Sequence, residues 1–119
     1  MGLTTHVLDT MHGTPAAGMD YALWALDAAG APQRRMASGR TTVDGRAQGG
    51  PLIADGSLVP GRYRLVFGVA AYFRARGVAL PDPPFLDTVT LDFGAADATT
   101  HYHVPLLVSP WSYSTYRGS

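Results

Sequence analysis

The sequence contains no cysteine and no lysine, and all nine of its basic residues are arginines. Without cysteine the chain has no disulfide, no thiolate nucleophile and no zinc site built on thiolates. Its apolar runs are too short to cross a bilayer as a helix, and its formal net charge is zero. Because an anionic membrane or a nucleic acid attracts clustered positive charge, we expect neither as a partner.

Length and composition predict a single globular domain spanning residues 1–119. The chain is 46% hydrophobic and 15% charged, values typical of a folded domain that is large enough to bury a core. Its first residues lack the charged segment followed by an apolar stretch that marks a signal peptide. We therefore expect a cytoplasmic protein, with periplasmic export by an unusual route as the alternative.

Turn signals built from glycine and proline recur along the chain and separate short apolar segments. The candidate strands between them are Thr4–Asp9, Asp20–Asp27, Arg34–Thr41, Gly61–Val69, Asp87–Phe93, Thr100–Val108 and Trp111–Tyr116. One further segment, Ala70–Arg76 before Gly77, has the composition and the stop signal of a short helix. This spacing predicts an all-β protein, an antiparallel β-sandwich with one short helix.

The last nineteen residues carry the most informative pattern. The side chains alternate from His101 to Val108, as they do along a half-buried strand. One face is apolar and consists of Tyr102, Val104, Leu106 and Val108. The other face consists of His101, His103, Pro105 and Leu107. The outer face therefore carries two imidazoles, groups that titrate near neutral pH.

A second, aromatic-rich strand is predicted after Pro110, which cannot donate a hydrogen bond to a neighbouring strand. Alternation along this strand places Ser114, Tyr116 and Gly118 on the side that carries His103. Arg117 points to the opposite side, where we expect it to anchor the segment. We therefore predict that these last residues are ordered and form part of the site.

The first predicted strand brings another histidine to an outer face. Thr4, His6 and Leu8 share one side of that strand, and an Asp-Gly turn further along the chain is followed at once by Arg46. An outer sandwich face that combines histidine, arginine and apolar residues is unusual for a monomer. The pattern predicts that this face meets another subunit or a ligand.

Each of these features also has an ordinary interpretation. A single histidine or arginine on a strand is most often a solvated surface residue. The His-x-His spacing of residues 101–103 suits a metal, but a zinc site needs about four ligands and the sequence offers no evident third or fourth. The serines near the end of the chain lack the Gly-x-Ser-x-Gly elbow of a serine hydrolase. Taken one at a time, these features identify no function.

Together, four motifs carry a resemblance. They are HVLD at residues 6–9, T-x-x-D-G-R at 41–46, HYHVPLL at 101–107 and YSTYRGS at 113–119. In this combination the chain resembles the transthyretin-like 5-hydroxyisourate hydrolases, enzymes of urate breakdown. The most specific element is the final YRGS, because hormone carriers of the same fold diverge there. One departure is Val108, where the family commonly has leucine; it lies on the apolar face, where we expect no effect on activity.

The resemblance implies a transthyretin-like sandwich of two four-stranded sheets and a homotetramer arranged as a dimer of dimers. Active sites would then form at the dimer–dimer interface, along a central channel. Carried over by motif, the catalytic residues are His6, Arg46 and His103. The residues implied to bind substrate are His6, Arg46, Tyr116, Gly118 and Ser119. No metal and no organic cofactor is implied.

The implied reaction is hydrolysis of 5-hydroxyisourate to 2-oxo-4-hydroxy-4-carboxy-5-ureidoimidazoline. An imidazole beside an arginine is biased toward its neutral form and can act as a base, while Arg46 offers a charged donor fork to an oxyanion. We favour His103 for activating water and His6 for polarising the substrate, with the reverse left open. The alternatives are a transthyretin-type carrier of a small planar ligand and a pure interaction module.

Overall fold

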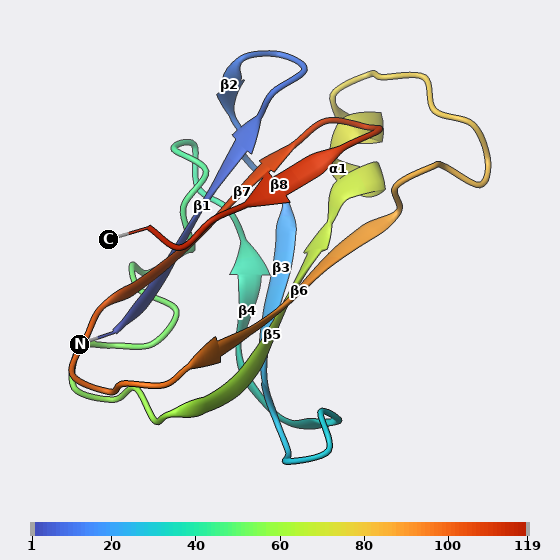
Figure 1. Cartoon of the computed structure of the whole chain (residues 1–119). Coiled ribbons are helices and arrows are strands. Elements are labelled where there is room, and N and C mark those ends of the chain that lie inside the picture. Colours follow the sequence, from blue (N-terminus) through green and yellow to red (C-terminus); the bar gives the residue numbers. More distant parts are fainter. Residues whose placement is uncertain (1, 119) are drawn as a thin grey trace.

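Two four-stranded sheets face each other in the computed structural model, which describes residues 2–118 (Figure 1). The first sheet has the order β2-β1-β7-β8, and the second has the order β4-β3-β5-β6. The first contains β1 (Leu3–Asp9), β2 (Thr14–Pro15), β7 (Tyr102–Val108) and β8 (Tyr113–Thr115). The second contains β3 (Asp20–Leu26), β4 (Pro32–Arg40), β5 (Gly61–Gly68) and β6 (Thr88–Ala95). The predicted sandwich of two four-stranded sheets is confirmed.

The helix α1 (Val69–Ala75) follows β5 directly and packs its residues Val69, Ala70, Tyr72 and Phe73 into the interior. The sequence predicts this helix at Ala70–Arg76, so the observed helix begins and ends one residue earlier than predicted. The sequence pattern places Val69 in the preceding strand, because Val69 continues the apolar alternation of β5. In the structure the helix already begins at Val69, and the Ala70 N–H donates to the Asp87 carbonyl, 2.9 Å away. Gly77, with φ at +83°, ends the helical segment as predicted.

The main departures of the strands from the prediction concern β2, β8 and the pairing of β1 with β7. The strand β2 has only two residues and was not predicted, and the predicted strand Trp111–Tyr116 is shortened to Tyr113–Thr115. The pairing of β1 with β7 is parallel, whereas the other pairs are antiparallel. Because β1 and β7 come from opposite ends of the chain, no hairpin constrains their direction. Figure 1 shows them side by side at the front, blue beside red.

The core lies between the sheets and contains the apolar faces that the alternation predicts. On β7 the inward residues Tyr102, Val104, Leu106 and Val108 are each no more than 7% exposed. They face a layer from the second sheet that includes Tyr63, Leu65, Phe67, Val89 and Leu91. Burial of this kind stabilises the fold by roughly 25 cal/mol for each Å² of apolar surface removed from water.

A carboxylate is also buried at the end of β1. Asp9 is fully buried and accepts hydrogen bonds from the backbone N–H of His12 at 2.9 Å and from its Nδ1 at 2.6 Å. The Tyr72 hydroxyl donates to the same carboxylate at 2.7 Å, and Arg76 Nη1 lies 3.7 Å from it. Burial raises the pKa of Asp9, but the hydrogen bonds from His12 and Tyr72 outweigh that effect and hold the pKa below its ordinary value. The carboxylate thereby joins β1, the turn that follows it and α1.

We predict that Asp9→Asn lowers the free energy of unfolding by roughly 2–4 kcal/mol, because it removes a buried charge on which several donors converge. Urea denaturation measures this change. The matched control is Asp20→Asn, whose ion pair with Arg40 is largely exposed and should contribute less than about 1 kcal/mol. Because the folded-state pKa of Asp9 is depressed, its stabilisation is present above the ordinary value and is lost as the pH falls below about 4. Equal losses in the two variants would contradict this role.

Candidate active site

The parallel register of β1 and β7 brings the predicted histidines together. Thr4 pairs with His103, and His6 pairs with Pro105. Paired residues in neighbouring strands point to the same side of a sheet, and the intervening Thr5 is buried in the core. His6 and His103 therefore lie on the outer face of the first sheet, as predicted. On the same face Leu8 and Leu107 are partly exposed, whereas Pro105 is buried within the chain rather than accessible to a ligand.

Arg46 reaches this face through a tight turn. The Gly45 N–H donates to the Thr42 carbonyl at 2.9 Å, and the Thr42 N–H donates to the Arg46 carbonyl at 2.8 Å. Gly45 has φ at +76°, and a Cβ atom there would lie 2.4 Å from the Val7 carbonyl oxygen. Only glycine allows the turn to approach β1 so closely. The turn is held to the strand by a bridge between Arg46 and His6.

The imidazole of His6 is oriented by the same turn. Its Nε2 lies 2.7 Å from the Asp44 carbonyl oxygen. Since a carbonyl oxygen only accepts, His6 Nε2 carries the hydrogen in this contact. Nδ1 is therefore the His6 nitrogen that remains for a contact with substrate or water.

His103 is held in place on two sides. Its Nδ1 lies 2.8 Å from the Thr4 hydroxyl, and its carbonyl accepts a hydrogen bond of 2.8 Å from the Gly118 N–H. A Cβ atom at position 118 would lie 2.6 Å from His103 Cδ2. Glycine fits position 118 because its backbone packs directly against the His103 ring.

The surroundings of His103 favour its neutral form. Burial lowers the pKa of the ring, and the permanent positive charge of Arg46 lowers it further, as His6 and His101 do whenever they are protonated. The ring therefore remains neutral at pH values where an ordinary imidazole is already partly protonated. A neutral imidazole beside a permanent cation can accept a proton from water and still have a group nearby that stabilises negative charge.

The position of the segment after β8 agrees in part with the prediction. The Arg117 guanidinium stacks on the Tyr102 ring, 4.4 Å from its centroid, and its Nη2 lies 3.4 Å from the Thr100 hydroxyl. Arg117 thus anchors the segment on the core side. Tyr116 is 60% exposed and lines a shallow hollow together with His101, Arg117 and Gly118. The prediction for Ser119 falls outside the described residues.

Two residues of this face were not predicted as part of the site, namely Thr4 and His101. Thr4 lies two residues before His6, and His101 lies two residues before His103. The period of two that located the histidines also places both of these residues on the same face. That signal was in the sequence, but it did not show that the two side chains contact each other.

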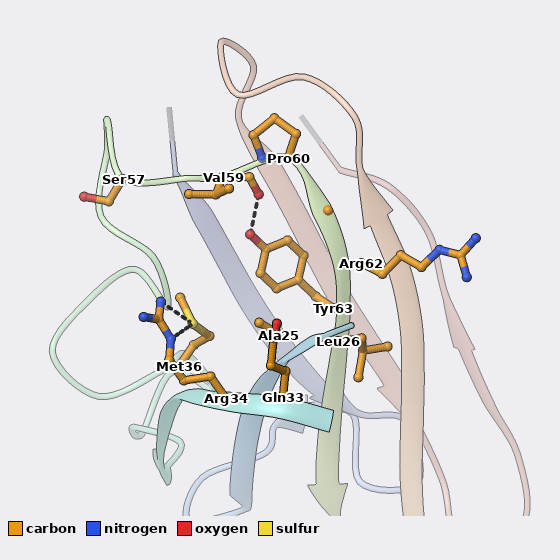
Figure 2. A pocket seen from close by; sticks show the side chains of 11 residues that line it. Ala25, Leu26, Gln33, Arg34, Met36, Ser57, Val59, Pro60, Arg62 and Tyr63 are labelled. Atoms are coloured by element: carbon orange, nitrogen blue, oxygen red, sulfur yellow. Dashed lines mark hydrogen bonds between the residues drawn. The ribbon is translucent and has the colours of Figure 1, made fainter. Parts of the chain in front are cut away.

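A more enclosed concavity of the chain lies elsewhere. Figure 2 shows this cavity, between the β3–β4 hairpin and the segment that leads into β5. The Tyr63 hydroxyl donates to the Val59 carbonyl at this cavity, and the Arg34 guanidinium lies beside the Met36 sulfur. None of His6, Arg46 and His103 lines this cavity. These three residues lie on the outer face of the first sheet instead.

A known protein family matches nearly the whole chain. The model of the HIUase/Transthyretin family matches residues 3–118. The chain belongs to this family. A curated relative from Ralstonia nicotianae, named 5-hydroxyisourate hydrolase, is 56% identical over 117 residues, which are 98% of this chain and 97% of the relative.

Solved structures of the family confirm the transthyretin-like fold. A structure of (S)-allantoin synthase has a TM-score of 0.91 and 44% identity, and the match covers 99% of this chain and 43% of that protein. A structure of sea bream transthyretin in complex with thyroxine has a TM-score of 0.83 and 29% identity, and the match covers 99% of this chain and 95% of that one. The fold is thus shared by enzymes and by a protein that binds a hormone.

We predict that the His103 pKa lies below the ordinary imidazole value and rises when Arg46 is replaced by glutamine. The reason is that Arg46→Gln removes a positive charge that opposes protonation of the ring. Titration of the imidazole signals by nuclear magnetic resonance measures the change. Arg62→Gln, on the second sheet, is the matched control and should leave the His103 pKa unaltered. An identical His103 titration in wild type and Arg46→Gln would show that the two groups do not interact.

Proposed function

We propose that this protein hydrolyses 5-hydroxyisourate to 2-oxo-4-hydroxy-4-carboxy-5-ureidoimidazoline, a step of urate breakdown. The assignment as an enzyme, a hydroxyisourate hydrolase, agrees with the names of its curated relatives. The observation that carries the proposal for this chain is the meeting of His6, Arg46 and His103 on one outer face. A carrier of a planar ligand has no need for acid–base groups that converge in this way.

In this mechanism His103 activates water. Its lowered pKa keeps the ring neutral, and Thr4 holds its Nδ1, so that Nε2 is the nitrogen that takes the proton. The water oxygen then bonds to the acyl carbon of the substrate, and the ring C–N bond breaks as the leaving nitrogen gains a proton. General-base assistance of this kind contributes roughly 10²–10⁴-fold in rate.

Arg46 and His6 act on the substrate itself. The Arg46 side chain is exposed on the site face and offers a planar, permanently charged donor fork to the oxyanion that develops during attack. His6, oriented by the Asp44 carbonyl through Nε2, polarises the substrate by donating from Nδ1 in its imidazolium form. Tyr116, Gly118 and Ser119 complete the binding surface in this proposal.

The site also requires a second subunit in this proposal. The outer face of the first sheet is open in the single chain, and Leu8 on that face is 36% exposed. We propose a homotetramer, a dimer of dimers, in which a facing copy covers these residues and supplies the opposite wall of the site. We also propose a cytoplasmic location. Within residues 2–118 no helix has the length and apolar character needed to cross a membrane.

The second candidate function is a carrier of a small planar ligand. It is favoured by the likeness to sea bream transthyretin, whose structure was solved with thyroxine. The carrier alternative requires binding without turnover. Decay of freshly prepared 5-hydroxyisourate, followed by ultraviolet absorbance with and without protein, separates the two functions.

We predict that His103→Ala and Arg46→Ala each lower the hydrolysis rate by roughly 10²–10⁴-fold, because each removes a group that acts in the transition state. Thermal melting should change little, since both residues lie on the outer face. Arg62→Ala is the control and should retain full activity. If His103→Ala or Arg46→Ala remains close to wild type in the absorbance assay, the role proposed for that residue is wrong.

We predict that the protein is a tetramer in dilute solution and that Leu107→Asp on the outer face yields a smaller, less active species. A buried interface excludes an unpaired carboxylate. Light scattering coupled to gel filtration measures the mass. Val59→Asp, at a position that is 65% exposed, is the control and should leave the assembly intact. A stable monomer with full activity would rule out a site shared between subunits.

A further inference from the structure

The Thr4 hydroxyl lies between two imidazoles. Its oxygen is 2.8 Å from Nδ1 of His103 and 3.0 Å from Nε2 of His101. Both contacts are within hydrogen-bonding distance. They result from the β1–β7 register, which pairs Thr4 with His103 and leaves His101 just before the start of β7. The three side chains therefore form a connected row on the face that carries the proposed site.

A hydroxyl group has one hydrogen and two lone pairs, so when its hydrogen lies within the row, the row can be ordered in two ways. In the first order, His103 Nδ1–H donates to Thr4, and Thr4 donates to His101 Nε2. In the second order, His101 Nε2–H donates to Thr4, and Thr4 donates to His103 Nδ1. A neutral His103 thus carries its hydrogen on Nδ1 in the first order and on Nε2 in the second. When both rings donate to Thr4 instead, His103 carries its hydrogen on Nδ1, as it does in the first of these orders.

The two orders have opposite consequences for catalysis. Within residues 2–118, Nε2 of His103 has no hydrogen-bond partner, so it is the nitrogen left for water or substrate. Of these two orders, only the first leaves that nitrogen with a free lone pair. The second order would place a hydrogen there and would prevent the ring from acting as a base.

We propose that Thr4 is a positioning residue that, together with His101, holds His103 in the Nδ1–H form, with Nε2 as the base. Thr4 accepts from His103 and donates to His101, and neither Thr4 nor His101 touches the reacting atoms. This inference rests on the proposed hydrolase function for its catalytic meaning. In other enzymes, too, a hydrogen-bond partner at one imidazole nitrogen sets the tautomer of the ring. The tautomer then determines whether the other nitrogen can accept a proton.

The test is the tautomer of His103 in the whole protein without substrate. Long-range proton–nitrogen correlation spectra of ¹⁵N-labelled protein, recorded above the pH at which the ring is protonated, report which nitrogen carries the hydrogen. We expect the Nδ1–H form in wild type and in Thr4→Ser, which keeps the hydroxyl. In Thr4→Val we expect a shift toward the Nε2–H form, which free neutral histidine prefers.

Two further variants sharpen the test. Thr5→Val makes the same change on the same strand, but Thr5 is buried and donates to the Val104 carbonyl, so His103 should keep the Nδ1–H form. His101→Phe removes the acceptor at the end of the row. It should move His103 part of the way toward the Nε2–H form. An unchanged tautomer in His101→Phe would show that His101 has no part in ordering the row.

The kinetic readout must separate positioning from binding. Thr4→Val should lower kcat by about 10–100-fold with KM little changed, the size of effect seen when a partner that orients an imidazole is lost, and Thr4→Ser should restore most of kcat. A wild-type His103 in the Nε2–H form, or a Thr4→Val protein with the wild-type tautomer or the wild-type kcat, would overturn the proposal. If wild type itself fails to hydrolyse 5-hydroxyisourate, the proposed function fails, and the spectra still decide the tautomer.

Discussion

The parallel pairing of β1 with β7 is the constraint on which the rest of the site depends. These strands come from opposite ends of the sequence, and their register places Thr4 opposite His103 and His6 opposite Pro105. A slip of one residue would turn every side chain of a strand to the other face. It would move the histidines into the core and bring Thr5 and Val7 out of it. Packing of the apolar face therefore maintains the geometry of the outer face.

Charge and burial act together around His103. The ring is partly enclosed by β1 and by the backbone of Gly118, and it faces the positive charge of Arg46. Both factors disfavour its protonated form. Arg46 in turn depends on Gly45, because no side chain fits between that turn and β1. A glycine without any functional group of its own thus determines where the arginine of the site lies.

The two ends of the first sheet use polar groups differently. At the end of β1, Asp9 is buried and saturated with donors from His12 and Tyr72, so its charge serves to join elements of the fold. On the outer face, the imidazole of His103 keeps one nitrogen without a partner among residues 2–118. A saturated group stabilises a structure, whereas a group with one free lone pair is available for chemistry.

Much of this arrangement follows from the sequence. Alternation alone separates the core face of β7 from the face with His101 and His103, and it places His6 on the outer side of β1. Turn signals locate most strand boundaries, and the motifs around His6, Arg46 and the last residues indicate the family. The brief strand β2 and the start of α1 at Val69 were missed, because a two-residue pairing has no periodicity and Val69 continues the pattern of β5.

Only the tertiary structure decided which outer residues meet. Periodicity says which side of a strand a residue occupies but carries no information about which strand lies beside it or in which direction that strand runs. The contact of Thr4 with both His101 and His103 therefore appears only when β1 and β7 pair in parallel. In the same way, the sequence contains the Asp-Gly-Arg turn, but the close approach of Gly45 to Val7 is what places Arg46 beside His6. Local patterns determined the faces, and long-range pairing assembled them into a site.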